Sequence, residues 1–133
     1  MTMRVMTMRT LAIAVLLALV GLVPKGAFAM DASFSWAGIA PCGKISPAFS
    51  LKDVPSATRR LRLMMHDNDA PHFHHGGSTV DYEGPLVPPG AVTYIGPCPP
   101  EGETHHYVWT IEALDAHGNV LAKTTAAGDF PAK

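Results

Sequence analysis

Glycine and proline follow one another so closely after residue 29 that no long helical pattern survives between them. The 133 residues include 12 glycines and 12 prolines, and both residue types weaken or break a helix when they stand inside it. The stretches between them are short, and they alternate apolar with polar residues or are rich in strand-forming side chains. The sequence therefore predicts an all-β or mostly β protein with little helix.

Seven short runs are the expected strands, and their spacing is typical of a β-sandwich. Residues 60–66 would place Leu61, Leu63 and Met65 on one face, because side chains alternate along a strand. Residues 115–119 are turn-forming and are expected to close a hairpin. The seven expected strands are residues 33–36, 48–51, 60–66, 79–82, 92–95, 105–114 and 120–125.

The first 29 residues have the features of a signal peptide. Arg4 and Arg9 give a positive start, residues 11–23 are apolar and uncharged, and Ala27-Phe28-Ala29 has the small-x-small pattern that precedes cleavage. A membrane anchor is the alternative, but the apolar run is shorter than the roughly 20 residues of a spanning helix. We therefore expect cleavage after Ala29.

Cleavage there would leave one domain, residues 30–133, in the periplasm or outside the cell. Met-Thr-Met-Arg occurs twice near the start, so translation could begin at Met1, Met6 or Met8. Residues 30–133 hold all 11 acidic residues and seven of the ten Lys and Arg, a formal charge of −4 with neutral histidine. This balance offers no basic surface for nucleic acid, so we expect no nucleic-acid partner.

Two cysteines, Cys42 and Cys98, remain after the leader. An even pair in an exported protein predicts a disulfide, which would close a loop worth roughly 4 kcal/mol in the chain-entropy model. Two buried free thiols are the alternative. Their wide separation in the chain excludes a zinc or redox site of the Cys-x-x-Cys type.

Residues 66–107 carry six of the seven histidines, together with the carboxylates of Asp67 and Asp69. Alternation along the strand expected at 105–114 would put His105 and Tyr107 side by side, with Trp109 packing below them. Polar groups held at strand ends by stiff Gly/Pro loops commonly form a binding site. The six histidines are His66, His72, His74, His75, His105 and His106.

Two motifs in this stretch resemble those of the phosphatidylethanolamine-binding protein family, also called Raf-kinase-inhibitor-like proteins. The family's Asp-Pro-Asp-Ala-Pro appears as residues 67–71, with Asn68 in place of the first proline. Its Gly-Pro-x-Pro-Pro-x-Gly motif matches residues 96–102, and His105-His106-Tyr107 stands where the family has His-Arg-Tyr. The family's intervening histidine is matched best by His74-His75.

The resemblance extends from about residue 46 to residue 114. Residues 46–51 and 54–55 resemble the Ser-Pro-x-Phe and Val-Pro stretches of bacterial members, whereas Gly76-Gly77 departs from the bulky strand that other members have. The chain ends at Lys133, so the C-terminal helical part of larger members is not expected. The sequence therefore resembles a short, exported bacterial variant.

The resemblance implies a Greek-key-like β-sandwich with a small pocket at one end of the strands. In the family this pocket binds anions, notably the phosphate of phospholipid head groups. Carried over by motif, the lining would include Asp67 and Tyr107, with Asp69 nearby. The complete expected ligand-binding set is Asp67, Asp69, His75, Pro97, His105 and Tyr107.

The residue types fit such a pocket if Asp67 accepts a hydrogen bond from a histidine and holds its tautomer. The imidazoles and the Tyr107 hydroxyl would then donate to phosphate oxygens, and Asp69 could pair with an ammonium group. The simpler alternative is that Asp67 and Asp69 only stabilise a turn. His117 is expected to lie exposed in the distant hairpin turn.

Two other functions fit parts of the pattern. Histidines together with Asp67 could supply three or four metal ligands, but no His-x-His or His-Glu-x-x-His spacing is fixed on a regular element. A histidine–aspartate pair with Tyr107 could also hydrolyse a phosphate ester, although no nucleophile motif such as Gly-x-Ser-x-Gly occurs. We therefore expect a binding protein without a cofactor and without catalytic residues, whose oligomeric state stays open.

Overall fold

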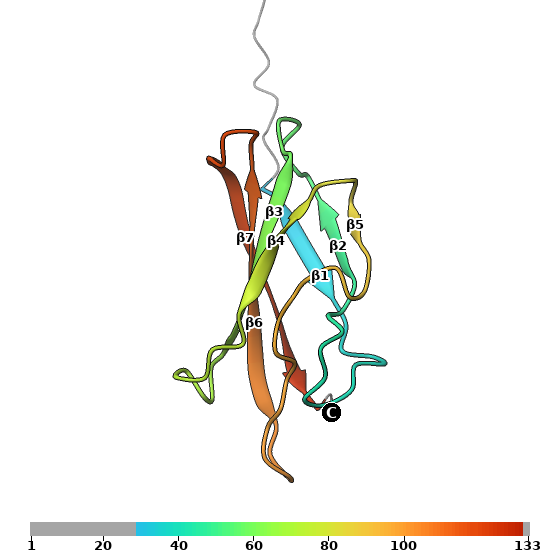
Figure 1. The fold of residues 1–133 in the computed structure, drawn as a ribbon, viewed down its shortest axis with the longest axis vertical. Helices are drawn as coiled ribbons and strands as arrows, with labels where there is room; N and C mark the ends of the chain where they lie inside the picture. Colours follow the sequence, from blue (N-terminus) through green and yellow to red (C-terminus); the bar gives the residue numbers. More distant parts are fainter. Residues whose placement is uncertain (1–28, 132–133) are drawn as a thin grey trace, which may run out of the picture.

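All regular elements in residues 29–131, the part that this computed structural model describes, are β-strands (Figure 1). The predicted leader at residues 1–29 lies outside the described residues except for its last position. The seven strands are β1 (Asp31–Phe34), β2 (Phe49–Lys52), β3 (Arg60–Asp67), β4 (Gly77–Asp81), β5 (Leu86–Val87), β6 (His105–Leu114) and β7 (Val120–Phe130).

The strands form two antiparallel sheets, as the predicted sandwich requires. One sheet has the order β4-β3-β6-β7, and the smaller one has the order β1-β2-β5. In Figure 1, β1, β2 and β5 lie to one side of the long strands of the larger sheet. The expected all-β fold is therefore confirmed.

Alternating side chains fill the space between the sheets. In β6 the buried positions include Tyr107, Trp109 and Ile111, while the residues between them are partly exposed. Leu61 and Leu63 of β3 are buried on the same side, as period-2 patterning predicts. Phe49 of β2 meets Trp109 edge to face, with ring centroids 5.0 Å apart, so the smaller sheet packs directly onto β6.

Two sequence expectations about strands were wrong. Residues 92–95 alternate in burial but form no strand, because neighbouring groups bind their backbone donors. Val92 N–H donates to the Ser46 hydroxyl, and Thr93 N–H donates to the Ser78 hydroxyl. The short β5 was not predicted, and β7 runs to Phe130, beyond the expected end at residue 125.

The expected disulfide joins Cys42 to Cys98. Backbone hydrogen bonds flank it, since Cys42 N–H donates to the Pro97 carbonyl and Gly96 N–H donates to the Gly43 carbonyl, each at 2.8 Å. The loop after β1 is thereby fastened to the Gly/Pro loop before β6. Within residues 29–131, no helix has the length and apolar character needed to cross a membrane.

Candidate functional site

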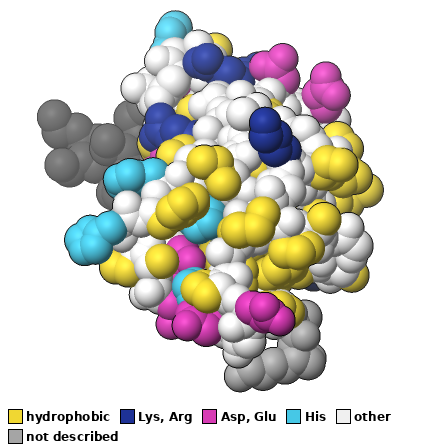
Figure 2. Space-filling view, turned by 60° about the horizontal axis from the view of Figure 1, so that its bottom comes forward, with side chains coloured by type: hydrophobic (Ala, Val, Ile, Leu, Met, Phe, Trp, Pro, Cys, Tyr) yellow, Lys and Arg dark blue, Asp and Glu magenta, His cyan; other side chains and the backbone are white. Residues whose placement is uncertain are grey.

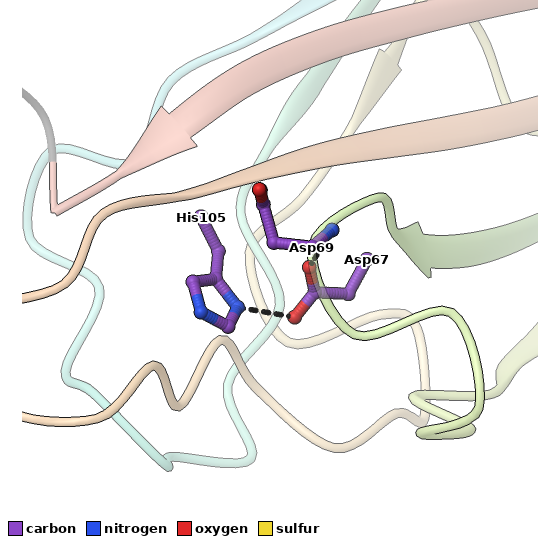
Figure 3. A group of neighbouring side chains, drawn as sticks. All are labelled: Asp67, Asp69 and His105. Carbon is purple, nitrogen blue, oxygen red and sulfur yellow. Dashed lines mark hydrogen bonds and ion pairs between the residues drawn. The ribbon is translucent and has the colours of Figure 1, made fainter.

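The end of β3 and the beginning of β6 meet at one edge of the larger sheet, and this places the candidate site. Asp67, the last residue of β3, pairs in register with Tyr107 of β6. The chain then turns away from the sheet at Asp69, and His105 opens β6 beside it. Figure 3 shows the Asp67 carboxylate meeting the His105 ring, with Asp69 beside them and its carboxylate turned toward β6.

The Asp67 carboxylate divides its two oxygens between a turn and a histidine. Oδ1 accepts the backbone N–H groups of Asp69 and Ala70 at 2.9 and 3.1 Å, and Oδ2 lies 2.7 Å from Nδ1 of His105. The turn-stabilising and histidine-orienting functions considered for Asp67 are therefore both present in the geometry. Burial raises the pKa of this carboxyl, but the hydrogen bonds from His105 and the two amides bring it below its ordinary value.

Both ring nitrogens of His105 face carboxylates. Nδ1 contacts Asp67, and Nε2 lies 3.1 Å from Oε2 of Glu103. Ionised carboxylates only accept hydrogen bonds, so the two contacts together favour the imidazolium form, in which both nitrogens donate. The hydrogen bond to Asp67 raises the pKa of His105; burial opposes the rise, and the bond to Glu103 adds to it.

His75 lies near the same oxygen of Asp67 that His105 contacts. Its Nδ1 lies 2.7 Å from the Ile95 carbonyl, to which it donates, and its Nε2 is 3.7 Å from Asp67 Oδ2. Gly77 follows two residues later with φ of +151°, and a Cβ there would overlap the Leu63 carbonyl. Glycine at this position lets the His75 loop approach β3 closely.

A cavity of about 170 Å³ opens between these side chains. The histidines are its only lining side chains that can carry positive charge. In Figure 2 this end of the molecule shows acidic and histidine side chains together, with the visible Lys and Arg lying away from them. The lining residues are Asp67, Ala70, Phe73, His75, Cys98, Pro100 and His105.

Three residues of the expected set do not line this cavity. Tyr107 is fully buried, its hydroxyl has no hydrogen-bond partner among the described residues, and burial, with the nearby Asp67 charge, raises its pKa. Its ring lies under both imidazoles, with centroids 5.4 Å from His75 and 6.2 Å from His105. Pro97 is buried behind the wall, and exposed Asp69 accepts the His106 N–H at 2.6 Å.

The remaining histidines lie outside the cavity. His106 points to the opposite face of β6, where its Nδ1 lies 2.7 Å from Asp129 Oδ1 of β7. His117 is exposed in the hairpin turn, where the sequence had placed it. The other exposed histidines are His66, His72 and His74.

A cation is the other ligand that the cluster could hold. One ligand atom from each of Asp67, Asp69 and His105 lies within 4.8 Å of the others. Several of these atoms already have partners, however, because Asp69 caps His106 and Asp67 binds two amides and an imidazole. A metal would therefore compete with hydrogen bonds that the protein already makes.

Sequence reasoning did not find Glu103, Phe73, Cys98 or Pro100 as parts of the site. Glu103 could have been found, because it stands two residues before His105, and side chains two apart in extended chain share a side. The other three belong to loops whose path depends on the fold. Phe73 packs against the His75 ring with centroids 4.6 Å apart.

Comparisons with known proteins agree with the resemblance found in the sequence. The sequence model of the phosphatidylethanolamine-binding proteins matches residues 74–130, which include His75, His105 and Tyr107. UPF0098 protein YbhB of Escherichia coli (strain K12) is 28% identical over 95 residues, covering 53% of this chain. Over the matched segment, 57 of the 133 residues, the chain is similar to the phosphatidylethanolamine-binding protein family. It aligns with only 60% of YbhB's own length, and Asp67 and Asp69 precede the segment that the family model matches.

Solved structures of the phosphatidylethanolamine-binding protein family have the same fold. A putative family homologue, CT736 of Chlamydia trachomatis, superposes with a TM-score of 0.58 at 20% identity, covering 79% of this chain and 99% of CT736. E. coli YbcL, described as a member of the mammalian family, gives 0.50 at 19% identity, covering 68% of this chain and 82% of its own. At these identities the likeness concerns the fold alone.

Proposed function

We propose that this protein binds a small ligand bearing a phosphate group, in the cavity between Asp67, His75 and His105. The environment of His105 carries the proposal, because its ring faces a carboxylate at each nitrogen and its pKa is raised. A charged histidine inside a small cavity is a strong donor to an anionic oxygen. The similarity to the phosphatidylethanolamine-binding proteins favours the same class of ligand.

Each expected site residue has a role in this proposal. Asp67 orients His105 and favours its charged form, and Tyr107 supports both histidine rings from beneath. Pro97 stiffens the wall behind Cys98 and Pro100. Asp69, at the exposed rim, could pair with an ammonium group such as that of ethanolamine.

The size of the cavity limits what can enter. About 170 Å³ is less than the roughly 300–1,000 Å³ of pockets that enclose drug-sized ligands. A phosphate head group is of suitable size, while the remainder of a phospholipid would stay outside, next to the half-exposed ring of Phe73. Phosphoethanolamine is therefore a suitable probe, together with inorganic phosphate.

The site of action is proposed to be the periplasm or the exterior of the cell. Residues 1–29 have the pattern of a cleavable leader, and the Cys42–Cys98 disulfide is of a kind that persists in oxidising compartments. The domain that binds the ligand would be residues 30–133. These two observations support export independently of the ligand.

The direct test is calorimetric titration of residues 30–133 with phosphate and phosphoethanolamine. His105→Ala should weaken binding about ten- to a hundred-fold, since a charge-assisted hydrogen bond is worth roughly 1.5–3 kcal/mol. His117→Ala, in the distant turn, is the matched control and should bind as wild type does. Equal affinities for the two variants would remove His105 from the site.

Metal binding is the second candidate, because three ligand atoms gather within 4.8 Å. Titration with zinc in the same instrument separates the two. Protons compete with metal for imidazole, so zinc affinity should rise with pH, whereas phosphate affinity should fall. Tight zinc binding without phosphate binding would favour the metal.

A further inference from the structure

Glu103 occupies the part of His105 that an incoming anion would need. Its Oε2 lies 3.1 Å from His105 Nε2, the nitrogen that Asp67 leaves free. The Glu103 side chain is 59% exposed, whereas that of His105 is 11% exposed. The carboxylate thus reaches the buried ring from solvent, and it can move away without disturbing the core.

The backbone of Glu103 is held in place while its side chain is free to leave. Glu103 N–H donates to the Pro100 carbonyl at 3.0 Å, and Gly102 before it has φ of +81°. Pro100 itself lines the cavity. The carboxylate is therefore tethered at the entrance by a short, turned segment.

The charged groups around His105 are mainly carboxylates, and this affects how an anion could bind at its Nε2. Asp67 and Asp69 face the ring from the segment that ends β3, and Glu103 faces it from the segment before β6. His75 and Tyr107 are the other titratable neighbours, and no Lys or Arg of the described residues lines the cavity. An anion that entered beside Glu103 would meet excess negative charge, so the carboxylate must leave first.

We propose that Glu103 is an internal competitor, a carboxylate that holds the anion position of His105 until a ligand displaces it and so lowers the affinity of the site for anions. This inference rests on the proposed function and names what limits binding at the site. A tethered group competes at an effective concentration of the order of millimolar. Such a competitor lowers the affinity of each displacing anion by the same factor.

The experiment compares wild type, Glu103→Gln and Glu101→Gln by calorimetric titration with inorganic phosphate and with acetate at pH 6. Glu101→Gln is the matched control, because it removes the same charge from an exposed position in the same loop. Exposed ion pairs are weak, so Glu103→Gln should tighten acetate binding about two- to fivefold. Phosphate binding should tighten by a similar factor, because the same competitor is removed for both anions.

A second measurement follows His105 without any ligand. Diethyl pyrocarbonate acylates an accessible nitrogen of neutral imidazole, so the reaction is run at pH 9, and peptide mass mapping separates His105 from the other histidines. The rate of modification at His105 should rise several-fold in Glu103→Gln and stay unchanged in Glu101→Gln. Equal rates in all three proteins would show that Glu103 does not cover Nε2, and would overturn the inference.

The outcomes separate this inference from the function on which it rests. If wild type binds phosphate and Glu103→Gln keeps the same affinities, the role of Glu103 is wrong and the phosphate site stands. If none of the three proteins binds phosphate, the proposed function fails and takes this inference with it. Weaker acetate binding in Glu103→Gln would make Glu103 a ligand-binding residue and would also overturn the proposal.

Discussion

At the scale of single residues, the pairing of Asp67 with His105 defines the site. The sequence predicted that Asp67 would orient a histidine, but it did not say which one. It did not predict that Tyr107 lies beneath the cavity instead of lining it. Tyr107 shares its face of β6 with Trp109, and a strand facing the core buries both.

The raised pKa of His105 predicts that this residue stabilises the fold most at acidic pH. Its folded pKa lies above the ordinary 6.5, so the contribution is fully present below about 6.5 and is lost as pH rises through the folded value. Urea unfolding of wild type and His105→Gln at pH 6 and pH 9 measures this. The stability difference should shrink at pH 9, and an unchanged difference would contradict the assignment.

Asp67→Asn should destabilise the protein by about 1.5–3 kcal/mol, the usual worth of a hydrogen bond to a charged group. The carboxylate is 2% exposed, and the amide would leave the His105 imidazolium without its counter-charge. Asp81→Asn, at an exposed position of β4, is the control and should change little. Chemical denaturation at pH 6 compares them, and similar stabilities would mean that Asp67 only supports the turn.

At the scale of elements, the strength of the alternation decided which strands could be predicted. β3 and β6 have long, regular patterns, and their positions agree with the expected ranges to within one residue. Residues 92–95 alternate between buried and exposed side chains but pair with no strand, so the pattern led to a wrong prediction. Side-chain hydroxyls accept hydrogen bonds from their backbone amides instead. β5 has two residues, too few to leave a pattern.

The Cys42–Cys98 disulfide should couple stability to ligand binding, since Cys98 lines the cavity. Replacing both cysteines by serine should cost roughly 4 kcal/mol, the chain-entropy value for this loop length. Phosphate affinity should also fall, because the wall of the cavity loses its attachment to the loop after β1. Denaturation and calorimetry of the double variant test this, and unchanged affinity would show that the wall holds without the bridge.

Gly77→Ala should destabilise the start of β4, since a Cβ there meets the Leu63 backbone. Backbone strain of this kind costs of the order of 1–3 kcal/mol, and the clash adds to it. Gly76→Ala is the control, because Gly76 also has positive φ but a methyl group there would meet nothing within 4 Å. Thermal unfolding of both variants should show the larger loss for Gly77, and equal losses would leave strain alone as the cause.

At the scale of the whole molecule, alternation predicted two sheets but not the strand order. The order β4-β3-β6-β7 brings residues far apart in sequence together, and such pairings depend on how loops close and not on local pattern. The end pocket came from the family resemblance, and the structure supplies the cavity and the charged neighbours of His105.

Export predicts the mass of the mature protein. The chain recovered from the periplasm or the medium should begin at Met30, within a residue or two, because the leader pattern ends at Ala29. Its intact mass should lie about 2 Da below the fully reduced value, as one disulfide requires. Mass spectrometry before and after reduction decides this, and a chain that keeps residues 1–29 would contradict cleavage.

The pH dependence of phosphate binding tests the central claim most directly. A charged His105 inside the cavity takes up or retains a proton when an anion binds, so affinity should rise as pH falls from about 8 to 6. The raised pKa of His105 places the midpoint above 6.5. Calorimetric titration of wild type with inorganic phosphate at pH 6, 7 and 8 should show this rise, and His105→Ala should lack it. No detectable phosphate binding at pH 6, together with zinc binding that tightens toward pH 8, would contradict the account.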